Sequence, residues 1–163
     1  MVDVYATESD RAAAILAVSF VENRITDLLL QFMVERPKVA DMFEGDRPLA
    51  TLSAKISLAF ALGLLPPNVH ADLGLLRKLR NQFAHSDVAV QFSDSPARDW
   101  CSALSLVSPD SSVAVKSASL VKPRGQFLMT VAATTYYLQQ ICSALQNGTM
   151  QRCVAPSPVR LMQ

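Results

Sequence analysis

One short stretch of the chain combines residue types that can perform acid–base chemistry on RNA. In "LLRKLRNQFAHSD", Leu75–Asp87, Arg80 and Asn81 are followed after three more residues by His85. Histidine titrates near neutrality, so His85 is able to take a proton from a 2′-hydroxyl or give one to a leaving 5′-oxygen. Arg80 would offset charge on the phosphate, and Asn81 would position His85 or a phosphate oxygen. These three residues are the predicted catalytic residues of a metal-independent ribonuclease that leaves 2′,3′-cyclic phosphate ends.

Arg80 and His85 do not share a face of a regular helix, because five residues correspond to about 140° of rotation. Two arrangements would bring them together. In the first, the helix would end near Ala84, so that His85 could turn towards Arg80. In the second, two copies of the chain would each contribute residues to one site. The bland alternatives are a helix-end histidine that interacts with the helix dipole and a solvated basic face, since such a spacing also arises by chance.

Charged residues also interrupt the apolar stripes of two predicted helices. Arg80 falls within one stripe, and Glu22 and Arg11 fall within the stripe of the first helix. Since a buried charge without a partner costs about 3–5 kcal/mol, we predict that Glu22 pairs with Arg80, within the chain or across a subunit boundary, with Arg11 nearby. Arg77, on the flank of the helix, completes this supporting polar network. A purely structural ion pair is the alternative.

The elements that must position these residues are predicted to be α-helices. Five glycines and long stretches of helical periodicity favour an all-α fold, a bundle of about five helices with long first and last members. We predict loops over "VADMFEGDR" and "SPDSSVAVKSAS". The first expected helix runs from about Glu8 to Val34, and the second, with Pro48 in its first turn, ends at Gly63. A third helix runs from "LPPN" to about Ala84. A short fourth helix has Ser95 as its N-cap and Pro96 in its first turn, and the last helix runs from "PRGQ" to Gly148.

Composition limits the other classes of protein. The chain has 163 residues, half of them hydrophobic, with a net charge of +1, which suits a domain with a real core and argues against unspecific nucleic-acid binding. We predict one helical domain over 1–148 and a flexible tail over 149–163. The start of the chain lacks signal-peptide features and the longest apolar run is too short for a membrane span, so we expect a cytoplasmic protein.

No cofactor or metal is expected from the sequence. The three cysteines, Cys101, Cys142 and Cys153, lack the spacing of metal ligands, and their odd number argues against a disulfide framework. His70 stands 15 residues before His85 without a zinc-like spacing, and it is predicted to lie at the surface.

Three segments, in order, resemble a known family. "SDRAAAILAVSFVENRITDLLLQFM", "GDRPLATLSAKISLAFALGLL" and "LGLLRKLRNQFAHS" resemble the mannitol operon repressor family of bacteria. The resemblance is strong from Ser9 to Ser86 and continues weakly through "SPARDWCSAL" and "PRGQFLMTVAA". Within it, "RNQFAHS" resembles the Arg-(Asn/Asp/His)-x3-His signature of HEPN domains, which are all-helical and common in bacterial toxins, antiphage systems and RNA-processing enzymes.

The two resemblances imply different functions for a homodimer. The HEPN resemblance implies an endoribonuclease acting on RNA, with Arg80 and His85 as catalytic residues at a dimer interface and with a protein regulator or antitoxin. The mannitol repressor resemblance implies transcriptional control. Because no helix-turn-helix pattern or strongly basic surface helix is evident, sequence-specific DNA binding is not expected. The alternative function is therefore a non-catalytic regulator that acts through a protein partner.

Overall fold

The structure, a computed structural model, describes residues 7–106 and 122–153. These residues form six α-helices and no strand, so the prediction of an all-α bundle is confirmed. The helices are α2 (Asp10–Phe32), α3 (Pro37–Asp41), α4 (Leu52–Ala61), α5 (Pro67–His85), α6 (Ala97–Ser102) and α7 (Pro123–Gln146).

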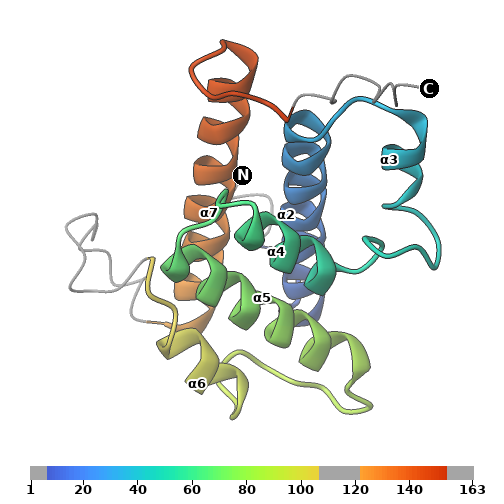
Figure 1. The fold of residues 1–163 in the computed structure, drawn as a ribbon. Helices are drawn as coiled ribbons and strands as arrows, with labels where there is room; N and C mark the ends of the chain where they lie inside the picture. The colour runs from blue at the N-terminus through green and yellow to red at the C-terminus, as the bar shows by residue number, and fades with distance from the viewer. Residues whose placement is uncertain (1–6, 107–121, 154–163) are drawn as a thin grey trace, which may run out of the picture.

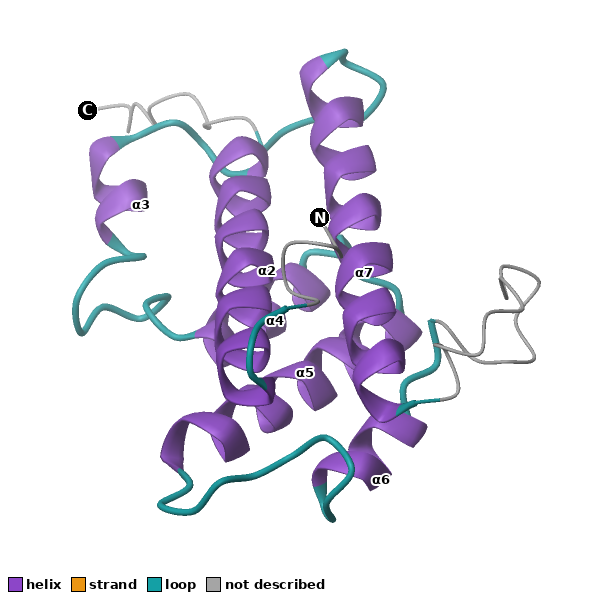
Figure 2. Cartoon of the chain, turned by 180° about the vertical axis from the view of Figure 1, so that it is seen from behind, coloured by secondary structure: helices purple, strands orange, loops and turns teal. Residues whose placement is uncertain are grey.

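The two long helices, α2 and α7, lie side by side and run in the same direction (Figures 1 and 2). At their N-terminal ends Arg124 forms an ion pair with Asp10, and at their C-terminal ends the Gln146 amide donates to Gln31 Oε1 at 3.3 Å. Helix α5 packs against both α2 and α7, α4 packs against α2 and α5, and α6 packs against both α5 and α7. The short α3 stands apart from the bundle and buries none of its residues.

Local sequence explains where the main helices begin. The Ser9 hydroxyl accepts a hydrogen bond from the Ala12 amide at the start of α2, and Thr51 does the same for Ala54 at the start of α4. Pro67 occupies the first turn of α5, where a missing N–H costs nothing, as "LPPN" predicted. Gly63 follows α4 with a φ of 73°, a conformation that favours glycine.

The core lies where the helical period places it. The apolar residues that share one face of α5 by their spacing are fully buried, with Leu73, Leu76, Leu79 and Phe83 each at most 1% exposed. Phe92, in the loop after α5, lies between Phe83 and Phe127, with ring centroids 4.6 and 4.8 Å away. This aromatic row fixes the C-terminal half of α5 against the start of α7.

Several predicted boundaries are wrong. Pro48 lies before α4, because Thr51 provides the side-chain cap and the helix starts one residue later. The segment "VADMFEGDR" is not entirely loop, since its first residues belong to α3, which Pro37 opens. Helix α6 starts at Ala97 with Pro96 as its N-cap, and the Ser95 hydroxyl instead donates to Asp99.

The structure also bears on expectations about the stripe of α4, the C-terminal tail and membrane spans. Phe60 shares the helical spacing of the buried Leu52 and Ile56, yet it is 41% exposed and stacks on the half-buried His70 with ring centroids 4.3 Å apart. Within the predicted tail, the Cys153 amide donates to Phe32 O at 2.8 Å. The predicted loop over 108–119 and the tail from 154 onwards lie outside the described residues. In the described part of the chain, no helix combines the length and apolar composition that a membrane span requires.

Candidate functional site

The C-terminal half of α5 positions the predicted catalytic residues. The helix continues through His85, and Ser86 is its C-cap, with the Ser86 amide donating to Gln82 O at 3.2 Å. The idea that the helix ends at Ala84 and frees His85 to swing round is therefore wrong. Hydrogen bonds to the last carbonyls hold this helix end in place.

His85 opens onto a shallow groove between α5 and α6. Side chains spaced three or four residues apart on α5 share one face, so His85 lies beside Asn81 and Lys78. The groove has a volume of about 430 Å³ and is lined by Lys78, Asn81, Gln82, His85, Ser86 and Trp100. His85 is exposed, whereas Asn81 and Trp100 are half-buried.

Arg80 does not line this groove, although it is linked to it. Its guanidinium Nη1 donates to Asn81 Oδ1 at 3.2 Å, and the side chain is half-buried. A single chain therefore brings Asn81 and His85 together and connects Arg80 to them only through Asn81. The rotation of about 140° between Arg80 and His85 is preserved because the helix stays regular.

The predicted pairing of Glu22 with Arg80 within one chain is wrong. Lys55 Nζ lies 2.8 Å from Glu22 Oε1 and joins α4 to α2, with side chains that are 8% and 21% exposed. Lys55 occupies the buried face of α4 together with Leu52 and Ile56. The rule that singled out Arg80, a charge within an apolar stripe, would also have found Lys55.

The other two members of the predicted network also lie elsewhere. Arg11 is exposed rather than part of the apolar stripe of α2, and its guanidinium donates to Ala84 O at 2.9 Å and Ser86 O at 3.3 Å. It thus caps the C-terminal end of α5, where carbonyls lack helical partners. Arg77 is half-buried and makes no ion pair or side-chain hydrogen bond with another described residue.

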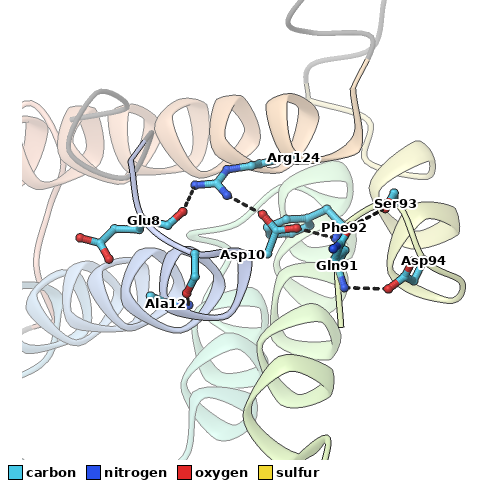
Figure 3. Close-up of polar contacts among 9 residues, drawn as sticks. Glu8, Asp10, Ala12, Gln91, Phe92, Ser93, Asp94 and Arg124 are labelled. Atoms are coloured by element: carbon cyan, nitrogen blue, oxygen red, sulfur yellow. Dashed lines mark hydrogen bonds and ion pairs between the residues drawn. The ribbon is translucent and has the colours of Figure 1, made fainter. Parts of the chain in front are cut away.

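Two anionic clusters were missed by the sequence analysis. In the first, Asp10 accepts a hydrogen bond from the Phe92 amide at 2.9 Å and forms an ion pair with Arg124, which also donates to Glu8 O at 2.6 Å (Figure 3). An acidic residue in the first turn of a helix was a usable signal for a charge at this position. The cluster joins the starts of α2 and α7 to the loop after α5.

The second cluster is centred on the buried carboxylate of Asp72, which is 1% exposed. It accepts hydrogen bonds from the Ser105 amide at 3.0 Å, the Ser105 hydroxyl at 3.1 Å and the Leu106 amide at 2.8 Å. These bonds attach the segment after α6 to α5. The signal was again available, because Asp72 lies on the buried face of α5 between Val69 and Leu73.

Two titratable groups of α6, Cys101 and Asp99, have pKa values shifted by their surroundings. Burial is the main cause that raises the pKa of the Cys101 thiol to about 12, and Asp10 adds to it. The hydrogen bond from Ser95 is the main cause that lowers the pKa of the Asp99 carboxyl, followed by Arg98. Among the described residues, no group of three or more His, Cys, Asp and Glu is placed to hold a metal ion.

The described helices define a small all-helical protein with an exposed polar groove at the end of α5. A family model described as Mannitol repressor matches residues 6–151, so the chain belongs to the mannitol repressor family. Its fold resembles a chain in the X-ray structure of the MtlR–HPr complex from Escherichia coli, with a TM-score of 0.56 and 22% sequence identity. The match covers 86% of this chain and 92% of that chain. No significant match to a curated protein is found.

Proposed function

We propose that this chain is a non-catalytic regulator of transcription that acts by binding a protein partner, with HPr as the first candidate. The observation that carries the proposal is the family match over residues 6–151. The E. coli MtlR was crystallised with HPr, and this chain shares the fold over 92% of the matched chain. That complex supports the proposal that this chain also binds a protein partner.

The arrangement of charge on α5 supports indirect rather than direct control of DNA. Helices α4 and α5 follow one another closely and contact each other, as the two helices of a DNA-binding helix-turn-helix do. In that motif the N-terminal residues of the second helix contact the bases. Here Pro67–Leu76 contains neither lysine nor arginine, and the cations of α5 lie in its second half. One face of α5 is also buried in the bundle.

Transcription of a reporter under the mannitol operon promoter tests the proposal. In a strain lacking the chromosomal copy, restoring this chain should lower reporter expression in the absence of mannitol. The purified chain alone should not shift the promoter fragment more than a scrambled fragment of equal length. Failure to repress would contradict the regulatory role. Specific binding of the promoter fragment by the chain alone would show that it acts on DNA directly and not through a protein partner.

A second candidate function, a metal-independent HEPN-type endoribonuclease, is favoured by one observation. His85 is exposed and shares a groove with Asn81 and Lys78, so an RNA phosphate has access to an imidazole and a cation. Arg80 is linked to Asn81 but does not line the groove of its own chain. A complete site would need a second copy of the chain to supply the missing arginine.

RNA cleavage in the presence of EDTA tests this second function. The wild-type protein, His85→Ala and Arg80→Ala should be incubated with structured and single-stranded RNA, with Lys38→Ala on α3 as a control for loss of one charge. The enzyme hypothesis expects 2′,3′-cyclic phosphate ends from wild type and Lys38→Ala only. Absence of cleavage by wild type, or equal cleavage by His85→Ala, contradicts it.

A further inference from the structure

The second half of α5 carries positive charge that the rest of the described chain does not neutralise. Between Leu73 and Ser86 there are three cations and one histidine, and no acidic residue. Neither Arg77, Lys78 nor Arg80 forms an ion pair with a described carboxylate. By contrast, Lys55, Arg98 and Arg124 are each paired.

The groove beside this charge also presents an aromatic side chain. Trp100 of α6 lies opposite Lys78 and His85 as part of the groove wall and is half-buried. Tryptophan is enriched among the residues that dominate protein–protein binding energies. Asn81 and Gln82 of α5 add neutral donors and acceptors to the lining of the groove.

From these observations we propose that the groove formed by Lys78, Asn81, His85 and Trp100 is a docking surface for a short acidic segment of a protein partner. This inference rests on the proposed function in one respect, namely that the chain acts through proteins. Carboxylates of the segment would lie over Lys78 and His85, and an apolar side chain would contact Trp100.

The charges around the groove favour a short acidic segment over RNA. The exposed Asp87 directly follows Ser86, the C-cap of α5 that lines the groove. A phosphate backbone crossing the groove carries charge at every nucleotide and would meet this carboxylate. A peptide with two or three acidic residues can place its charges over the cations alone. The net charge of +1 gives no broad field that would attract a polyanion.

Trp100 provides a direct readout, because it is the single tryptophan of the chain. Its fluorescence should be followed while a twelve-residue peptide of four Glu-Leu-Gly repeats is added at moderate salt. A peptide with lysine in place of glutamate serves as the ligand control. We expect saturable change with the acidic peptide, and binding weakened about tenfold or more by Lys78→Glu.

A matched variant separates local from general electrostatics. Lys38→Glu on α3 changes the net charge by the same amount but lies outside the groove, so it should leave peptide affinity within about twofold of wild type. Equal weakening by Lys38→Glu and Lys78→Glu would overturn the docking surface. Absence of any response to the acidic peptide would overturn it too. Tighter binding of single-stranded RNA, again lost in Lys78→Glu, would assign the groove to nucleic acid instead.

The outcome is distinguishable from that of the proposed function. HPr binding unchanged in Lys78→Glu, together with no response to the peptide, would leave the regulator standing and remove the docking surface. A peptide response without HPr binding or repression would support the docking surface and contradict the proposed regulatory function.

Discussion

Lys55 Nζ lies 2.8 Å from Glu22 Oε1, and this ion pair joins α4 to α2 at a point where Lys55 is almost fully buried. Replacing Lys55 by Ala leaves the Glu22 carboxylate without its partner in a partly buried place. Because Glu22 retains some exposure, we expect a loss of about 2–3 kcal/mol in the free energy of unfolding, less than the loss of about 3–5 kcal/mol for a fully buried pair. Urea denaturation followed by circular dichroism measures it.

The double variant Glu22→Gln with Lys55→Met is the control for this pair. Removing both charges should restore stability to within about 1 kcal/mol of wild type, since an uncharged pair leaves no isolated charge. The cycle is completed by the single variants Glu22→Gln and Lys55→Met, and strictly additive losses in it would show that the two side chains do not interact.

Asp72 should be required for the order of the segment after α6. Asp72→Ala removes an acceptor shared by the Ser105 amide, the Ser105 hydroxyl and the Leu106 amide. We expect a loss of about 3 kcal/mol in unfolding free energy and faster hydrogen exchange at both amides. The isosteric Asp72→Asn keeps one carbonyl acceptor and should lose less. Unchanged exchange in Asp72→Ala would exclude this carboxylate as the attachment point.

The three cysteines should differ in reactivity with iodoacetamide. Burial raises the pKa of Cys101 to about 12 and also raises that of Cys142, whereas Cys153 is exposed. At pH 8 the folded protein therefore holds Cys101 as the neutral thiol, and alkylation should follow the order Cys153, Cys142, Cys101. Peptide mass spectrometry of native and urea-unfolded samples measures it. Rapid native alkylation of Cys101 would contradict its burial.

The raised pKa of Cys101 also predicts the direction of a pH effect. The unfolded thiol ionises near 9.0 and the folded thiol only near 12, so folding favours the protonated form. The contribution of this group to stability is complete below pH 9 and falls as pH rises towards 12. Between these values wild type should lose more unfolding free energy than Cys101→Ala. Parallel pH dependence of the two proteins would show that Cys101 does not titrate differently on folding.

Arg11 should stabilise the end of α5 that carries His85. Its guanidinium donates to Ala84 O and Ser86 O, so Arg11→Ala should cost about 1 kcal/mol and increase amide exchange in the last turn of α5. Arg24→Ala is a matched control, because it removes the same charge from an exposed i, i+3 pair on the same helix. The control should change stability by less than about 0.5 kcal/mol. Equal effects of both variants would argue against capping by Arg11.

Helical periodicity predicted the fold well because the core is built from regular stripes. Leu73, Leu76, Leu79 and Phe83 are buried as their spacing requires, and the prolines of "LPPN" open α5. Helix starts were less predictable, since Thr51 and Pro48 both offer starting signals and only the tertiary structure selects one. The aromatic row that includes Phe92 joins segments far apart in the chain and carries no local signal.

The candidate site is predictable in part because α5 is a regular helix. The angle between Arg80 and His85 follows from helix geometry, and the structure keeps it. Partners across the fold do not follow from a single helix wheel. Glu22 was assigned to Arg80 although Lys55 lies nearer, because several charges on apolar stripes compete and only packing decides between them. The capping role of Arg11 required knowledge that α2 begins where α5 ends.

Binding of a protein partner is the property on which the proposed regulatory role depends. Isothermal titration of HPr from the source organism into the purified chain measures it. We expect a saturable isotherm with a micromolar or tighter dissociation constant, and we expect it to be retained in Lys38→Glu, which lies outside the groove. A flat isotherm, combined with EDTA-resistant RNA cleavage that His85→Ala abolishes, would contradict the regulator and establish the enzyme instead.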